Sequence, residues 1–366
     1  MSLTAGACVD TGAPANPRTM QAGGAKPGSE IAVKKQASLP PPSSAQLRQV
    51  AKKYFAPLPA RIDTADNLPT DEKIALGRTL FYDERLSKNQ DVSCNTCHLL
   101  NNFGVDGKTV STGHRGQVGD RNSPTVFNAA LQLAQFWDGR EPTVEAQALG
   151  PMTNPVEMAM PNHEGVVNVL SSIPGYVDMF KAAFPDDKDP INPPNIGRAI
   201  GVFERGLTTP AAFDRFLTGD DNALTEDALR GLQLFVDAQC VTCHTGPGVG
   251  GTMYQKLGVI KPVPGIKDEG RIKITQDPKD KFFFKVPILR NITKTGPYRH
   301  DGEIKTLDEM LDLMATYQIA KGKLSADEKK YLTAFLQSLE GEVDPAYIQQ
   351  PELPASGPKT PKPDPT

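Results

Sequence analysis

Two short stretches of the chain share a pattern of residue types that can do chemistry. Residues 94–98 read Cys-Asn-Thr-Cys-His, and residues 240–244 read Cys-Val-Thr-Cys-His. Two thiols three positions apart can each add to a vinyl group on one edge of a porphyrin, while the adjoining imidazole binds the iron. The repeated pattern therefore predicts two covalently bound haem c groups, with these attachment residues: Cys94, Cys97, His98, Cys240, Cys243 and His244.

Three other kinds of site use closely spaced cysteines: a zinc knuckle, a redox dithiol and a disulfide. The four cysteines could hold one zinc ion, but a zinc site of that kind gives no reason for the His98 and His244 that follow immediately. The histidines therefore favour haem attachment over the three alternatives.

Each haem iron also has a sixth position, and the group there decides between electron transfer and reaction with a small molecule. His114 lies in a glycine-rich loop, which would allow a ligand to swing off its metal, or it is simply an exposed loop residue. His163 is expected to be solvated, and His300 to be structural or to contact a propionate. Met310 and Met314 lie one helical turn apart, so either could supply a thioether to the second iron, or both could be core residues.

Two helices should position the attachment sites. Residues 70–81 and 225–235 each begin at a threonine followed by acidic residues, end in Gly-x-x-Leu-Phe, and precede one of the two cysteine motifs. This weak internal repeat indicates a duplicated cytochrome c module. A later helix opens with a capping box formed by Ser325 and Glu328, and in such a module it would cross the first helix.

The pattern along the chain favours an all-α class, because helices alternate with long loops and no period-two alternation is sustained. The chain of 366 residues is long enough for two cores. We predict two cytochrome c-like haem domains with long loops, flanked by a disordered or draped N-terminal segment and a proline-rich tail, with these boundaries: 1–45, 46–207, 208–340 and 341–366.

Composition narrows the partners and the compartment. The net charge of −3 and sequence pI near 6.0 give no basic footprint for nucleic acid, and no apolar stretch is long enough for a transmembrane span. The first residues lack a secretory signal pattern, yet haem c is attached outside the cytoplasm, so we expect a mature or trimmed periplasmic chain. Cys8 is the unpaired cysteine, and a thiol in a disordered tail is favoured over lipid attachment.

Three further segments carry a family resemblance together with the two cysteine motifs: "GHRGQVGDRNSPTVFNAA", "FWDGREPTVEAQALGPMTNPVEMAM" and "LRNITKTGPYRHDG". Together, over roughly residues 60–340, the chain resembles bacterial dihaem cytochrome c peroxidases and the related MauG-type enzymes. The resemblance implies that an amino-terminal haem reacts with peroxide and that a carboxy-terminal haem accepts electrons from a small donor protein.

The resemblance also implies roles for individual residues. His98 is similar to the proximal ligand of the peroxidatic haem and His114 to its removable distal ligand, while His244 and Met314 resemble the ligands of the electron-transfer haem. Trp137 matches a residue between the haems, although it could also be an ordinary core aromatic. The other matches are to the peroxide pocket (Gln147, Pro151 and Glu157) and to a calcium site that suits carbonyl ligands (Asn122, Thr295 and Pro297).

The chemistry of peroxide supports Glu157 as the acid–base group, because cleavage of the O–O bond requires a proton to move between the two oxygens. A solvated loop glutamate is the alternative. We therefore expect reduction of hydrogen peroxide with electrons from a cytochrome c or a cupredoxin. MauG-like oxidation of a protein side chain is less favoured, because Met314 stands where those enzymes carry tyrosine, although Tyr317 is near. A non-enzymatic electron carrier is the third hypothesis, and the oligomeric state is open, with a homodimer as one alternative.

Overall fold

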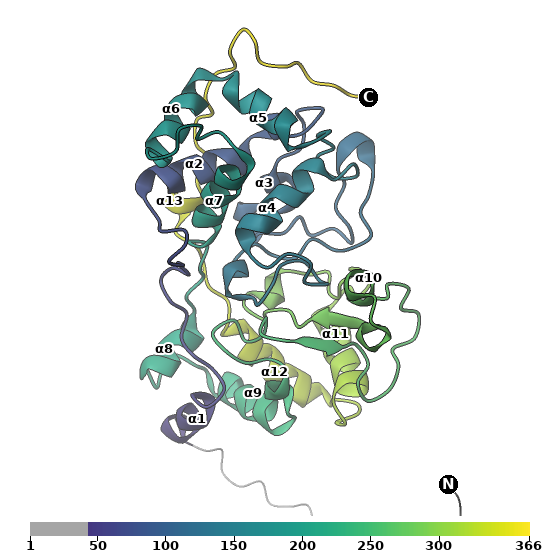
Figure 1. Ribbon diagram of the computed structural model, residues 1–366. Helices are drawn as coiled ribbons and strands as arrows, with labels where there is room; N and C mark the ends of the chain where they lie inside the picture. The colour runs from purple at the N-terminus through teal and green to yellow at the C-terminus, as the bar shows by residue number, and fades with distance from the viewer. Residues whose placement is uncertain (1–42) are drawn as a thin grey trace, which may run out of the picture. The chain divides into compact units, whose positions relative to one another are not determined.

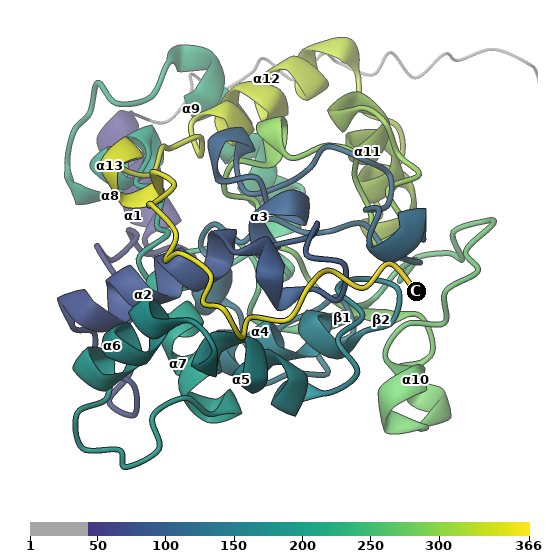
Figure 2. The ribbon, with the colours of Figure 1, turned by 90° about the horizontal axis from the view of Figure 1, so that it is seen from above.

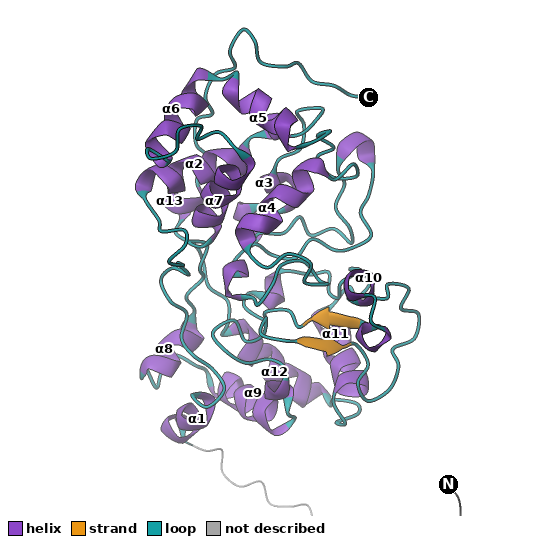
Figure 3. Cartoon of the chain, viewed as in Figure 1, coloured by secondary structure: helices purple, strands orange, loops and turns teal. Residues whose placement is uncertain are grey.

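Helices dominate the regular structure of residues 43–366, which are the residues described by the computed structural model (Figure 1, Figure 3). The mostly helical class is thus confirmed. Cys8 and nearly all of the predicted segment 1–45 lie outside the described residues. The α-helices of residues 43–366 are α1 (Ser44–Ala51), α2 (Asp71–Tyr82), α3 (Cys94–Cys97), α4 (Val144–Thr153), α5 (His163–Ser171), α6 (Pro174–Ala183), α7 (Pro193–Glu204), α8 (Ala212–Thr218), α9 (Glu226–Asp237), α10 (Ile272–Thr275), α11 (Leu307–Leu313), α12 (Ala326–Gln337) and α13 (Pro345–Ile348).

The predicted helix starts are confirmed by their caps. Thr70 accepts a hydrogen bond from the backbone of Lys73 at the start of α2, and Thr225 caps α9 in the same way. At the start of α12, Ser325 and Glu328 form the reciprocal capping box. Each cap satisfies amide groups that the first helical turn leaves without partners.

The two repeated helices are packed in the same way. Helix α2 lies against α7, and α9 lies against α12, so the predicted crossing of the late helix over its partner is confirmed. Each crossing places the glycine of the Gly-x-x-Leu-Phe repeat against a backbone carbonyl. A Cβ on Gly77 would lie 1.9 Å from the oxygen of Ala199, and one on Gly231 would lie 1.9 Å from the oxygen of Tyr331. Only glycine permits this approach.

Buried apolar side chains gather in two clusters. The first core cluster includes Leu76, Leu80 and Phe81 of α2 with Phe203 of α7, and the second includes Phe235 of α9 with residues of α12. Aromatic edges pack within each cluster, as between Phe81 and Phe203, whose ring centroids are 5.5 Å apart. The same packing of a glycine-containing helix against a second helix therefore occurs twice within residues 43–366.

The ends of the described chain cross between these clusters. Leu47, Ala51 and Phe55, which lie in α1 and just after it, belong to the second core cluster although the rest of that cluster begins at Phe213. Conversely, Val343 and Tyr347, which lie just before and within α13, pack with the first core cluster. The domain boundaries given above stay a prediction, because residues 42–366 form one compact unit by their contacts.

Residues 351–366 are extended and hydrogen-bonded along the first core cluster (Figure 2). Arg85 donates to the carbonyl of Pro354 at 2.8 Å, and the amide of Asp364 donates to the carbonyl of Lys88 at 2.9 Å. Arg115, in the predicted ligand loop, donates to the carbonyl of Thr366. This C-terminal tail is thus tied to several loops of the first cluster.

A small antiparallel sheet interrupts the helical pattern. Strand β1 (Tyr254–Lys256) pairs with β2 (Phe283–Lys285), and Tyr254 lies opposite Lys285. Strands of three residues are too short to give a recognisable alternating pattern in the sequence, so the sequence did not predict them. None of the helices described in residues 43–366 combines the length and the apolar character needed to cross a membrane.

Candidate active site

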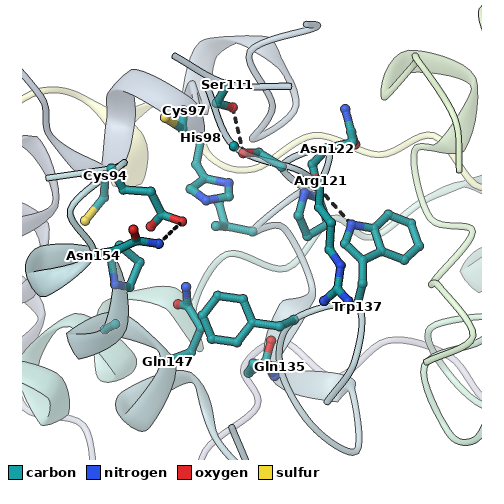
Figure 4. A pocket seen from close by; sticks show the side chains of 18 of the residues that line it. Cys94, Cys97, His98, Ser111, Arg121, Asn122, Gln135, Trp137, Gln147 and Asn154 are labelled. Carbon is teal, nitrogen blue, oxygen red and sulfur yellow. Dashed lines mark hydrogen bonds between the residues drawn. The ribbon is translucent and has the colours of Figure 1, made fainter. Parts of the chain in front are cut away.

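One cavity of about 580 Å³ collects most of the residues predicted for the first haem (Figure 4). This volume lies in the range of about 300–1,000 Å³ that is usual for small-molecule sites. Its walls come from α3, α4, the loop of residues 118–126 and strand β2. The predicted residues that line it are Cys94, Cys97, His98, Asn122, Trp137, Gln147, Pro151 and Glu157.

Helix α3 presents the attachment residues of this cavity. It is a single turn that begins after Ser93, whose side chain and backbone pair with Thr96. His98 follows at its C-terminus, and its amide bonds to the carbonyl of Cys94 at 3.0 Å. Burial lowers the pKa of His98, so its imidazole is neutral, which is the form that binds a metal.

The chemistry of the cysteines fits attachment to haem. All four are unbridged, and burial raises the pKa of both Cys94 and Cys240 to about 12. Within residues 43–366, no three His, Cys, Asp or Glu side chains gather as a metal cluster. The arrangement therefore does not support a shared zinc site or a disulfide. The Nδ1 atoms of His98 and His244 are both buried without a hydrogen-bond partner.

Glu157 lies on the cavity wall just after α4. The Asn154 side-chain amide donates to its Oε1 at 2.9 Å and holds the carboxyl in place. Burial raises the pKa of Glu157, although Arg140 and Asn154 act in the opposite direction. A carboxyl held in this way is the kind of group that can act as a general acid or base towards a bound molecule. Gln147 and Pro151 of α4 line the same cavity.

His114 is connected to this acid through the backbone. Its amide donates to the carbonyl of Glu157 at 2.8 Å, and the next residue, Arg115, has a positive φ of 58°. The side chain is buried, with an unpartnered Nδ1, but it is not among the residues that line the cavity. Gly113 and Val118 of the same loop do line the cavity. The structure thus places His114 beside the cavity and not on its wall.

Trp137 joins the segments on the other side of the cavity. Its Nε1 donates to the carbonyl of Asn122 at 2.9 Å, and its own carbonyl accepts from the amide of Lys285 at 2.8 Å. Figure 4 shows Trp137 and Arg121 across the cavity from Cys94 and Cys97. His300 is buried, as expected for a structural residue, and stacks on Phe284 with centroids 4.0 Å apart.

The second attachment motif lies after α9. Its His244 is half-buried with a buried Nδ1, and desolvation of the ring lowers its pKa to about 4. Gly250, with φ of +133°, would place a Cβ 3.1 Å from the Nδ1 of His244, so a side chain there would press on the ring. Val249 and Ala315, which follows Met314, belong to the same core cluster. Met314 itself opens a π-helix (Met314–Gln318) directly after α11. Such bulges are frequent at functional sites.

The residues expected to bind calcium are not brought into the cavity together. Asn122 lines it, whereas Thr295 and Pro297 do not. The Nδ2 of Asn122 donates to the carbonyl of Lys108 at 2.9 Å, so any oxygen ligand from this side chain would be Oδ1. His163 differs from expectation: its Nε2 lies 3.0 Å from the carbonyl of Leu149, and the ring is half-buried.

The polar cavity residues that the sequence did not predict include Asn154, Glu204 and Lys285. Burial raises the pKa of Glu204 to about 8 and lowers that of Lys285 to about 7. For Glu204 and Lys285, the local signal in the sequence was their position inside the apolar runs "GVFER" and "FFFKVP". A charged residue in such a run is rarely buried without a functional reason.

Comparison with known proteins gives the class. The family model described as "Di-haem cytochrome c peroxidase" matches residues 71–222. The chain is 43% identical over 309 residues to a "Cytochrome c551 peroxidase" of Nitrosomonas europaea, covering 84% of this chain and 90% of that protein. It is 35% identical over 320 residues to a "Methylamine utilization protein MauG" of Methylorubrum extorquens, covering 82% and 88%. The chain belongs to the di-haem cytochrome c peroxidase family and is an oxidoreductase.

Solved structures agree with this fold. A "MauG-like protein associated with microbial copper homeostasis" superimposes with a TM-score of 0.72 at 31% identity, covering 80% of this chain and 97% of that one. The diheme peroxidase BthA from Burkholderia thailandensis superimposes with a TM-score of 0.63 at 18% identity, covering 82% and 94%. The second likeness concerns the fold alone.

Proposed function

We propose that the protein reduces hydrogen peroxide to water with electrons from a small periplasmic redox protein, such as a cytochrome c or a cupredoxin. One hydrogen peroxide, two electrons and two protons give two water molecules. The observation that carries the proposal is the convergence of His98, Glu157, Gln147 and Trp137 on one cavity beside two unbridged cysteines.

In this proposal Cys94 and Cys97 hold the first haem, and His98 binds its iron. When bound, the haem supplies the redox centre that exchanges electrons with peroxide. Glu157 takes the proton from one peroxide oxygen and returns it to the other, which leaves as water. Gln147 and Pro151 shape the space around the peroxide. His114 is the removable ligand at the first iron.

The remaining assigned residues serve the electron path. Cys240 and Cys243 attach the second haem, with His244 and Met314 as its iron ligands. We assign Trp137 to the path between the two haem sites; its side chain donates to the carbonyl of Asn122, and its own carbonyl accepts from the amide of Lys285. The oxygens of Asn122, Thr295 and Pro297 are proposed to bind calcium, a metal that prefers such ligands.

The likeness to MauG proteins supports a second candidate, oxidation of a side chain on a partner protein. Tyr317 lies within the same π-helix as Met314 and could replace it as a ligand. A permanently six-coordinate electron carrier is the third candidate. Met314 and the placement of Glu157 favour the peroxidase.

Stopped-flow mixing of the dihaem protein with peroxide and a reduced cytochrome c or cupredoxin distinguishes the three candidates. The peroxidase oxidises two donor molecules per peroxide and returns to its starting spectrum. A MauG-like enzyme consumes peroxide without oxidising the donor catalytically, and a carrier does not consume peroxide. A Cys94→Ala/Cys97→Ala variant, which lacks the first attachment site, is the control and should show no turnover.

A further inference from the structure

Lys285 is buried at the wall of the first haem cavity. It ends strand β2 and is only 4% exposed. Its Nζ donates a hydrogen bond to the side-chain oxygen of Gln132, which is neutral. Within residues 43–366 it forms no ion pair with a carboxylate. The ammonium group is therefore held out of water without a carboxylate in direct contact.

The acid that acts on Lys285 is already engaged elsewhere. Asp138 raises the pKa of Lys285, but burial outweighs it and lowers that pKa to about 7. Asp138 is itself paired with Arg121 at 2.5 Å and with Arg140 at 3.2 Å. Since a buried charge is costly unless it is paired, the site lacks an anion.

The shape of the cavity indicates which anion belongs there. Cys94 and Cys97 lie on one side, and Trp137, whose carbonyl accepts from the amide of Lys285, lies on the other (Figure 4). A haem carries its vinyl groups and its propionates on opposite edges. If the vinyl edge is joined to the cysteines, the propionates point toward the side of Trp137 and Lys285.

We propose that Lys285 is a positioning residue whose ammonium group pairs with a propionate of the haem attached at Cys94 and Cys97, and so raises that haem's reduction potential. The inference rests on the proposed function, because it requires a haem in this cavity. A positive charge favours the ferrous state, because ferric iron carries one more positive charge.

The position of Lys285 also links the two haem sites. The next residue on the chain, Val286, accepts a hydrogen bond from Gly251 at 2.9 Å. Gly251 follows Gly250, whose backbone closely approaches His244. The segment that shapes the loop of the second haem therefore supplies the counter-charge to the first.

The test is a potentiometric titration of the dihaem protein followed by electron paramagnetic resonance, which separates the signals of the two irons. In Lys285→Met the midpoint potential of the first haem should fall, and in Lys285→Arg it should stay near that of the wild type. Lys256→Met is the matched control, because Lys256 lies in the same sheet but is exposed. An unchanged first-haem potential in Lys285→Met, or an equal fall in Lys285→Arg, overturns the proposal.

Haem content, measured by the absorbance of the pyridine complex, distinguishes the ways in which the test can fail. If Lys285→Met retains too little haem to titrate, restored haem content in Lys285→Arg supports the ion pair, and no restoration overturns it. If the wild-type protein carries no haem at Cys94 and Cys97, the proposed function fails as well. A loaded wild type with an unaffected variant contradicts the role of Lys285 alone.

Discussion

Glu157 combines a raised pKa with a defined hydrogen bond to Asn154, which is what a proton shuttle in the cavity requires. Glu157→Gln keeps the shape of the side chain but removes the exchangeable proton. We expect peroxide turnover to fall about 10²–10⁴-fold, with both haems still attached. Steady-state oxidation of a reduced donor measures this effect.

The control for that substitution is Glu164→Gln. Glu164 is exposed in the first turn of α5, so its replacement should leave turnover unchanged. Near-normal turnover in Glu157→Gln would remove this residue from the proton path.

Glu204 gives a prediction about stability and pH. Burial raises its pKa to about 8 from the ordinary 4.5, and the nearby Glu145 adds to the rise. Between these values the folded chain holds a proton that the unfolded chain has released, so the contribution of Glu204 to the unfolding free energy falls as pH rises. Glu204→Gln should remove this fall. Its melting temperature relative to wild type should therefore be higher at pH 8 than at pH 5.

Thermal melts of the haem-loaded protein at the two pH values test this prediction. Glu72→Gln, at an exposed position in the first turn of α2, is the control and should track the wild type. If the melting temperatures of Glu204→Gln and of the wild type change equally between the two pH values, the Glu204 carboxyl is ionised in the folded chain.

At the residue scale, the sequence predicts the groups whose chemistry depends on local spacing. Cys94, Cys97 and His98 are recognisable because one helical turn brings them together. Lys285 is not recognisable from the sequence, because its burial without a directly contacting carboxylate depends on which segments surround it. Whether Glu157 is solvated or buried is likewise a tertiary property.

At the scale of elements, the crossing of α9 over α12 depends on Gly231. A Cβ there would lie 1.9 Å from the backbone oxygen of Tyr331 and 2.8 Å from Phe335 Cβ, so the helices would have to separate. We expect Gly231→Ala to lower the unfolding free energy by about 1–3 kcal/mol, the usual cost of overpacking. Urea denaturation followed by circular dichroism measures it.

Helix α4 offers a matched control for this glycine. Gly150→Ala also adds a methyl group to a helix, but its nearest new contact would be an ordinary 3.6 Å to Phe136. It should be neutral or stabilising, because alanine favours helix more than glycine does by about 1 kcal/mol. Equal destabilisation of both variants would show that the crossing does not depend on close approach.

The loop that carries His114 yields a prediction about activation. We expect His114 to bind the first iron when both haems are oxidised, and reduction of the second haem to release it. His114→Gly should then abolish the need for prior reduction and give a high-spin signal in the oxidised state. Electron paramagnetic resonance and the rate of reaction with peroxide before reduction measure this.

A wild-type protein that is already high-spin and reacts with peroxide at once when oxidised would contradict the gating. His163→Gln is a suitable control, because that ring, at the start of α5, contacts the carbonyl of Leu149 in α4, lies outside the cavity lining and should not affect the spin state. The position of His114 beside the cavity wall does not by itself decide between the two resting states.

The elements themselves were largely predictable, since caps and glycine spacing act within a few residues. Thr70, Thr225 and Ser325 begin helices as predicted. Strands β1 and β2 and the π-helix could not be predicted from the sequence, because short strands and bulges are stabilised by distant partners. The register of Tyr254 opposite Lys285 brings together residues 31 positions apart.

At the scale of the whole molecule, the C-terminal tail predicts a local loss of stability on truncation. A variant ending at Gln350 loses the bonds to Arg85, Lys88 and Arg115. At about 0.5–1.5 kcal/mol per hydrogen bond, we expect the three lost bonds to cost about 1.5–4.5 kcal/mol near these loops. Hydrogen exchange followed by mass spectrometry should show faster exchange around residues 85–91 and 113–117.

Helices α9 and α12 are the internal reference for that experiment, because the tail does not pack on the second core cluster. Their exchange should be unchanged. Uniform acceleration along the chain would indicate global destabilisation, and no change anywhere would show that the tail contributes nothing to the loops.

The crossing of the chain ends has a consequence for how the molecule could be divided. A gene cut between residues 207 and 208 would not yield two self-sufficient proteins, because each fragment would carry an arm belonging to the other's interior. The first would expose Leu47 and Phe55 and lack Val343, while the second would show the reverse. Expressed together, such halves should associate, because each supplies the arm that the core of the other lacks.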